Sequence, residues 1–176
     1  MQERYRVYEG HYPHFITNTV HYWIPLFCRD DYFQVLVDSL RYCTEQKGLV
    51  LHGYVLMPNH FHALSSQTDG RLPDVVRDLK RHTSTVIAAK LEEDCRITWL
   101  RALRNAGGGE KVSVWIAQYH PIQVHSLEFL QQKLEYMHQN PVRAGFVERA
   151  EDWKYSSAGF YLRDWEPQVP VVPLEW

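Results

Sequence analysis

The fold of this chain is decided by the stretch LVLHGYVLMPNHFHALSS, residues 49–66. Residues 49–57 form a continuous apolar run, which is typical of a central strand covered on both faces. Pro58 and Asn59 are turn-forming residues. Residues 60–66 predict a second strand that returns antiparallel to the first. The sequence therefore predicts two adjacent antiparallel strands joined by a short turn.

A strand and a helix are expected before this pair. Residues 15–23 are rich in β-branched and aromatic side chains, which favours a strand. Asp30 or Asp31 can cap a helix, and Gly48 ends it. The apolar face of this helix consists of Phe33, Leu36, Val37 and Leu40.

A helix, a loop and a strand are expected after the pair. Apolar side chains recur near helical spacing in residues 72–91, which predicts a second helix. Residues 104–111 contain three consecutive glycines and predict a mobile loop. Residues 115–124 can supply a fourth strand, and Pro121 indicates that this strand lies at an edge of the sheet.

The order strand, helix, strand, strand, helix, strand is the split β-α-β pattern of ferredoxin-like domains. We therefore expect an α+β fold, with an antiparallel sheet and helices on one face. A third helix, capped by Ser126 and ended by Pro141, is an addition to that plan. The chain is expected to be a single domain, residues 1–176, with residues 148–176 as an irregular, acidic tail.

Composition narrows the class of protein. Hydrophobic residues make up 45% of the chain, which is enough for a packed core. No apolar run is long enough to cross a membrane, and residues 1–10 lack the apolar centre of a signal peptide. The three cysteines have the spacing of neither a disulfide framework nor a zinc site. We therefore expect a reducing, cytoplasmic setting.

The net charge and the distribution of charges point in different directions on nucleic-acid binding. A net charge of −2 argues against a generally basic nucleic-acid-binding protein. Residues 71–111 nevertheless hold nine Lys and Arg against six Asp and Glu, whereas residues 148–176 hold three against six. A basic middle and an acidic tail can form a binding face and an opposite face. Ordinary scattered surface charge explains the same counts.

Two histidines, His60 and His62, flank Phe61 in the second strand of the central pair. Residues i and i+2 of a strand point to the same face, so the two imidazoles can share one metal ion. With ten histidines in the chain, a pair at this spacing is also expected by chance, and the alternative is a solvated strand face. His52 and His82 lack partners at ligand spacing and are expected to be structural.

The third helix places a tyrosine away from its apolar side chains. Its apolar stripe consists of Leu127, Leu130, Leu134 and Met137. Tyr136 falls on nearly the opposite side and shares its face with Gln132 and Asn140, each four residues away. A large aromatic side chain beside two amides suits a reactive surface. The alternative is an ordinary surface tyrosine, one of the eleven tyrosines in the chain.

Three words occur in order along the chain: MPNHFHAL (57–64), LEYMHQNPVRAGFV (134–147) and DWKYSS (152–157). Together they resemble the HUH single-tyrosine transposases of bacterial insertion sequences. The nearer likeness is to the REP-associated tyrosine transposases, which act on repetitive extragenic palindromes. This resemblance runs over residues 13–157.

The resemblance implies a role for each motif residue. His60 and His62 match the metal ligands of the HUH motif, and Tyr136 matches the nucleophile. Asn140 stands where the family places a third metal ligand, often a glutamine in the insertion-sequence branch. The family uses Mg²⁺ or Mn²⁺, although two imidazoles also suit Zn, Cu, Ni or Co. The implied enzyme cleaves and rejoins single-stranded DNA through a 5′-phosphotyrosine.

The resemblance also implies partners: single-stranded DNA with hairpins or palindromic repeats, no membrane, and a monomer or homodimer at the bacterial nucleoid. Basic side chains of the second helix can hold the phosphate backbone, or can form a solvated face: Arg77, Lys80, Arg81 and Lys90. The acidic tail is expected to cover the site and compete with DNA. Tyr155 is the rival nucleophile.

Two other functions stay open. One is a metal-dependent phosphoesterase that uses water, and the other is a catalytically inactive regulator that binds DNA hairpins.

Overall fold

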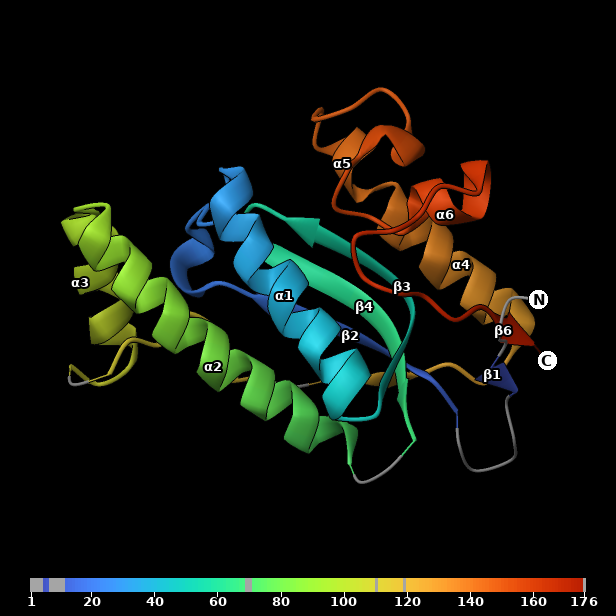
Figure 1. Ribbon diagram of the computed structural model, residues 1–176, viewed down its shortest axis with the longest axis horizontal. Coiled ribbons are helices and arrows are strands. Elements are labelled where there is room, and N and C mark those ends of the chain that lie inside the picture. The colour runs from blue at the N-terminus through green and yellow to red at the C-terminus, as the bar shows by residue number, and fades with distance from the viewer. Residues whose placement is uncertain (1–4, 7–11, 69–70, 110, 119, 176) are drawn as a thin grey trace.

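The computed structural model describes residues 5–6, 12–68, 71–109, 111–118 and 120–175. The main elements are β2 (His14–Thr19), α1 (Asp30–Gln46), β3 (Leu49–Met57), β4 (His60–Gln67), α2 (Leu72–Glu93) and β5 (Ile122–Gln123). The four strands form one sheet in the order β3-β4-β2-β5, with every neighbouring pair antiparallel (Figure 1). The predicted α+β, ferredoxin-like split β-α-β fold is confirmed.

The sheet separates two layers of helices. α1 and α2 cover one face, and α4 (Leu127–His138) lies on the other (Figure 1). Alternate residues of β4 therefore have different surroundings. Phe61 and Ala63 enter the larger core beneath α1 and α2. Leu64 enters a smaller apolar cluster with Met137 of α4.

The added helix α4 begins and ends close to its predicted limits. The Ser126 hydroxyl accepts a hydrogen bond from the Phe129 N–H at 3.2 Å, as an N-cap should. The helix ends at His138, and a short helix, α5 (Asn140–Arg143), follows with Pro141 in its first turn. The sequence thus predicted both boundaries of the helix that carries Tyr136.

A glycine lets α4 lie close to the sheet. A Cβ atom on Gly53 would stand 2.6 Å from Leu134 Cδ2 and 2.8 Å from Met137 Cε. Such distances are too short for a methyl group, so any side chain at this position would push α4 outward. Gly53 also follows a register shift between β3 and β4.

β3 is an edge strand of the sheet, not the central strand that its apolar run predicted. Its outer edge is covered by the C-terminal segment. The Leu56 N–H donates to the Tyr155 carbonyl, and the Val172 N–H donates to the Leu51 carbonyl, each at 2.8 Å. Because the tail covers this edge and helices cover both faces, β3 is buried throughout most of its length.

Three further elements differ from their predicted form. The first strand ends at Thr19, and a 3₁₀ turn, η1 (His21–Trp23), follows it. An unpredicted helix, α3 (Ile97–Ala106), includes the first residues of the expected loop, and Gly107 to Gly109 form turns after it. The fourth strand shrinks to the two residues of β5, at the sheet edge that Pro121 indicated.

The tail is more regular than the sequence predicted. It contains η2 (Ala150–Asp152), α6 (Ala158–Arg163) and β6 (Leu174–Glu175), which pairs in parallel with β1 (Tyr5–Arg6). Its backbone hydrogen bonds to the sheet run along β3. This segment completes the edge of the sheet, and its competition with DNA stays a prediction.

Tyr155 is built into the core. Its ring stacks on Phe33 at 4.0 Å between centroids, and its hydroxyl donates to Asp30 at 2.7 Å. The side chain is 4% exposed. A phenol held in this way is a structural group, which leaves Tyr136 without this rival.

Among the described residues, no helix combines the length and apolar character that a membrane crossing requires. Cys28, Cys43 and Cys95 are free thiols.

Candidate active site

The two histidines of the His-Phe-His word share one face of β4. His62 is paired with Thr17 of β2 on one side and with Val55 of β3 on the other. The imidazole centroids of His60 and His62 lie 4.9 Å apart with their planes at 74°. The predicted side-by-side arrangement is therefore present, and it faces α4.

Each of the two rings has a hydrogen-bond partner at Nδ1. His60 Nδ1 lies 2.8 Å from the Asn59 side-chain oxygen, and His62 Nδ1 lies 2.7 Å from the Thr17 hydroxyl. The amide oxygen of Asn59 can only accept, so His60 carries its proton on Nδ1 and keeps the Nε2 lone pair free. Partners of this kind orient histidines that ligate metals.

Burial keeps both rings neutral. Burial lowers the pKa of His62 to about 3, and the proximity of His60 and the positive charges of Lys133 and Arg143 add to the effect. Burial also lowers the pKa of His60 below its ordinary value. A histidine must be neutral to bind a metal ion, so both rings have the protonation state that a metal site needs near neutral pH.

Tyr136 reaches the histidines from α4. Its ring centroid lies 5.6 Å from that of His62 and 6.1 Å from that of Phe15. The side chain is 44% exposed, whereas its neighbour Met137 is fully buried. The tyrosine therefore lies off the apolar side of the helix, as predicted. The histidine pair of β4 and Tyr136 of α4, which are far apart in the sequence, therefore lie close together in the fold.

Asn140 makes contacts that hold the end of α4. Its side-chain amide donates to the Tyr136 carbonyl at 2.9 Å and to the Met137 carbonyl at 3.3 Å. These bonds leave the amide oxygen as the atom that could ligate a metal. The third-ligand role of Asn140 stays a prediction.

Two cations beside Tyr136 were not predicted. Lys133 Nζ lies 6.0 Å from the centroid of the Tyr136 ring and 5.1 Å from that of Phe15. Arg143 Cζ lies 4.8 Å from the centroid of Tyr136, and its guanidinium donates to the Tyr136 carbonyl. Lys133 precedes Tyr136 by three residues, a helical spacing that could have revealed it.

The residues present fit a divalent ion in part. His60 presents a free Nε2 lone pair, and His62 does so in the tautomer whose Nδ1 donates to the Thr17 hydroxyl. A carboxylate is not needed if phosphate oxygens complete the shell. Among the described residues, no group of three or more His, Cys, Asp or Glu could hold a metal ion. The site thus suits an ion that binds together with a phosphate.

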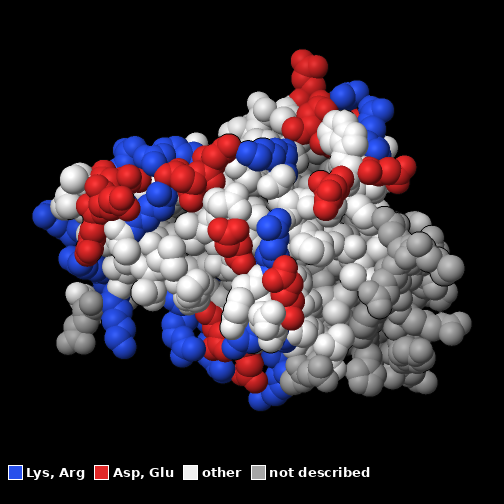
Figure 2. Space-filling view, in the orientation of Figure 1, with Lys and Arg blue, Asp and Glu red and all other residues white. Residues whose placement is uncertain are grey.

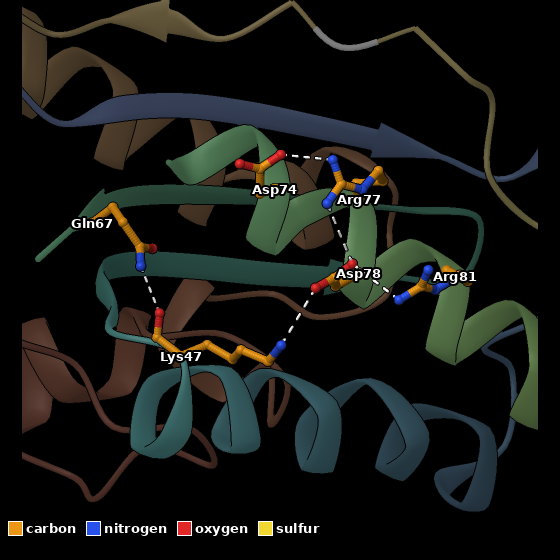
Figure 3. A network of polar contacts seen from close by, with 6 residues as sticks. All are labelled: Lys47, Gln67, Asp74, Arg77, Asp78 and Arg81. Carbon is orange, nitrogen blue, oxygen red and sulfur yellow. Dashed lines mark hydrogen bonds and ion pairs between the residues drawn. The ribbon is translucent and has the colours of Figure 1, made fainter. Parts of the chain in front are cut away.

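The four basic residues of α2 are not brought to this site, because α2 lies on the other face of the sheet. Figure 3 shows Arg77 bonded to Asp74 and Asp78, with Arg81 also on Asp78. Lys47 of α1 joins the same network. These exposed arginines have carboxylate partners on their own helix.

The other two basic residues of α2 are also engaged. Lys80 Nζ donates to the Ile116 carbonyl at 2.7 Å, and Lys90 lies 2.7 Å from Asp31. Burial lowers the pKa of Lys80. The contact of these residues with DNA stays a prediction.

Comparisons with known proteins bear on the family resemblance. No family model matches the chain. A Haemophilus influenzae protein inferred to be a REP-associated tyrosine transposase is 25% identical over 121 residues, or 69% of this chain. The solved structure of a REP-associated tyrosine transposase bound to a REP hairpin superposes with a TM-score of 0.64 at 17% identity, over 97% of this chain and 92% of the other. This chain is similar to REP-associated tyrosine transposases.

The likeness to REP-associated tyrosine transposases that the three words indicated is thus confirmed in sequence and in fold. The matched region spans 62% of the length of the H. influenzae relative. A second solved structure, of an inferred transposase from Deinococcus radiodurans, has a TM-score of 0.49 at 20% identity over 78% of this chain and 96% of the other.

Proposed function

We propose that this chain is a DNA strand transferase that cleaves and rejoins single-stranded DNA through Tyr136. The observation that carries the proposal is the approach of the exposed Tyr136 ring to His62, at 5.6 Å between centroids. A phenol beside two neutral imidazoles and two cations has the surroundings that attack on a phosphodiester requires.

In the proposed reaction, the Tyr136 oxygen attacks a backbone phosphorus atom. The new O–P bond forms as the bond from phosphorus to the 3′ oxygen breaks. The phenolic proton is lost, and the departing 3′ oxygen gains a proton and becomes a hydroxyl. The 5′ phosphate stays on the tyrosine as an ester, so a second 3′ hydroxyl can later reverse the attack without ATP.

Each neighbouring residue has a part in this proposal. A divalent ion, Mg²⁺ or Mn²⁺, would be held by His60 and His62, with Asn140 as a third ligand, and would polarise the phosphate when bound. Lys133 and Arg143 lie over the tyrosine ring. Their charges attract the phosphate to the same place and offset charge that develops on it.

The proposed substrate is single-stranded DNA that carries a hairpin or palindromic repeat. The similar solved structure is that of a transposase bound to a REP hairpin, which supports this class of DNA.

Replacement of the histidines tests the metal in this proposal. His60→Ala or His62→Ala should lower Mn²⁺-supported cleavage of a hairpin oligonucleotide at least about a hundredfold, because an ion contributes several kcal/mol to the transition state. Asn140→Ala should cost less, because water can replace a neutral ligand. His82→Ala, at an exposed site on α2, is the matched control. If His62→Ala cleaves the DNA with the same metal dependence as the wild type, the proposed metal site at the histidines is wrong.

A further inference from the structure

Two adjacent aromatic residues at the end of β2 have an unusual backbone. Tyr22 and Trp23 have φ angles of 57° and 55°, in the left-handed region that bulky residues rarely occupy. Their side chains are 63% and 61% exposed, so burial of the rings does not offset the strain. Residues held in this way are concentrated at functional sites.

The backbone around this pair is held from several sides. The Val20 N–H donates to the Asn59 carbonyl at 2.9 Å, and the His21 N–H donates to the Val114 carbonyl at 2.8 Å. On the far side, the Phe27 N–H donates to the Pro58 carbonyl at 2.9 Å. The bonds to Asn59 and Pro58 tie both ends of the turn to the β3–β4 connection. The two exposed rings are therefore presented on a rigid support.

The turn lies at the candidate active site. The Trp23 ring centroid is 6.0 Å from that of His60. His60 in turn is 4.9 Å from His62, which is 5.6 Å from Tyr136. Trp23 and Tyr136 thus contact different members of the histidine pair. A strand whose phosphate lies at the histidines would pass the exposed indole.

We propose that Trp23 forms a stacking platform for an unpaired base of the DNA strand beside the phosphate that is cleaved. This inference rests on the proposed function, because it uses the same site. Aromatic side chains bind bases of single strands by stacking, which tolerates many sequences. A rigid platform loses little conformational entropy when the base binds. This advantage is a reason for the turn to keep its strained backbone even in the free protein.

The test uses full-length Tyr136→Phe protein in EDTA, so that binding is measured without cleavage. The probe is a DNA hairpin with single-stranded extensions, in which 2-aminopurine replaces one unpaired base at a time. Binding should quench the fluorescence at one or two positions near the hairpin. Trp23→Ala should abolish that quenching and weaken binding about tenfold, as expected for the loss of one stacked base.

Three variants separate stacking from a structural role. Trp23→Phe should keep the quenching because it keeps a ring. Trp23→Gly should lose the quenching without a lower melting temperature, because glycine adopts a φ of 55° freely. Tyr42→Ala removes an exposed ring from α1 on the other face of the sheet, and should behave like the parent protein.

Unchanged quenching in Trp23→Ala, or no quenched position in the parent protein, would overturn the platform. A marked fall in the melting temperature of Trp23→Gly would assign the turn a structural role instead. These outcomes do not depend on chemistry at Tyr136. Failure of the wild-type protein to form a covalent adduct would count against the proposed function and leave the quenching result standing.

Discussion

At the scale of single residues, two buried histidines have different roles, one at the candidate site and one in the structure. His62 is buried but faces the exposed Tyr136, whereas His52 is surrounded by structural partners. His52 Nδ1 lies 2.8 Å from the Val172 carbonyl, and Nε2 lies 2.8 Å from the Ser66 hydroxyl. The expectation that His52 is structural is met. His82, which was expected to be structural too, lies exposed on α2.

The buried His52 should make the protein sensitive to acid. Burial lowers its pKa from 6.5 to about 4, so the unfolded chain binds a proton more readily than the native protein between these values. Stability is therefore full above pH 6.5 and falls as the pH drops toward 4, by about 3 kcal/mol from this residue. Urea unfolding from pH 7 to pH 4 should show a steeper loss in the wild type than in His52→Gln. Parallel curves would show that His52 does not titrate in this way.

The residue scale also shows which site groups a sequence can reveal. Strand periodicity placed His60 and His62 on one face of β4, helix periodicity placed Tyr136 off the core stripe, and the family resemblance gave these residues their expected roles. Lys133 and Arg143 were missed because their contacts depend on how α4 crosses the sheet. Helical spacing marks Lys133 as a neighbour of Tyr136, but only the packing of α4 shows that both lie near His62.

At the scale of elements, β3 shows the limit of pattern-based prediction. Its apolar run correctly predicted burial, but the cover comes from residues about a hundred positions later in the chain. No pattern within β3 itself can predict its pairing with the C-terminal segment. α3 was missed for a different reason: it is short, only Leu100 and Leu103 are buried in it, and three glycines follow directly.

The C-terminal segment that bonds to the edge of β3 should stabilise the protein without changing its affinity for DNA. Val172→Pro removes the N–H that bonds the Leu51 carbonyl, and should lower the free energy of unfolding by about 1–3 kcal/mol. Truncation after Ser157 removes the bond to Leu51, exposes that part of the edge and should cause aggregation. Affinity of Val172→Pro for a DNA hairpin should equal that of the wild type. Tighter binding by this variant would show that the tail competes with DNA after all.

At the scale of the whole molecule, the sheet divides two kinds of surface. On the face drawn in Figure 2, basic and acidic side chains lie intermingled over α2 and α3. The exposed arginines of α2 are paired with aspartates there. On the other face, Lys133 and Arg143 contact aromatic rings beside the histidines. This division explains how a chain of net charge −2 can present cations at one site.

Two double variants compare these surfaces. Lys133→Gln with Arg143→Gln should weaken hairpin binding at least about tenfold at low salt, and the salt dependence of binding should become shallower, because phosphate contacts are lost. Arg77→Gln with Arg81→Gln should have a small effect, since those charges are already neutralised by neighbouring carboxylates. Equal losses in both variants, measured by fluorescence anisotropy across a salt series, would show that the DNA also contacts α2.

The most direct test of the account is the covalent bond between Tyr136 and DNA. The protein is incubated with Mn²⁺ and a hairpin oligonucleotide labelled at its 3′ end, and the products are separated on a denaturing gel. The wild-type protein should carry the label, and Tyr136→Phe should carry none while it still binds the DNA, because only the attacking oxygen is removed. Label that persists on Tyr136→Phe would contradict the assignment of the nucleophile. Cleavage without any labelled protein would indicate a phosphoesterase that uses water, and binding with neither cleavage nor label would indicate a hairpin-binding regulator.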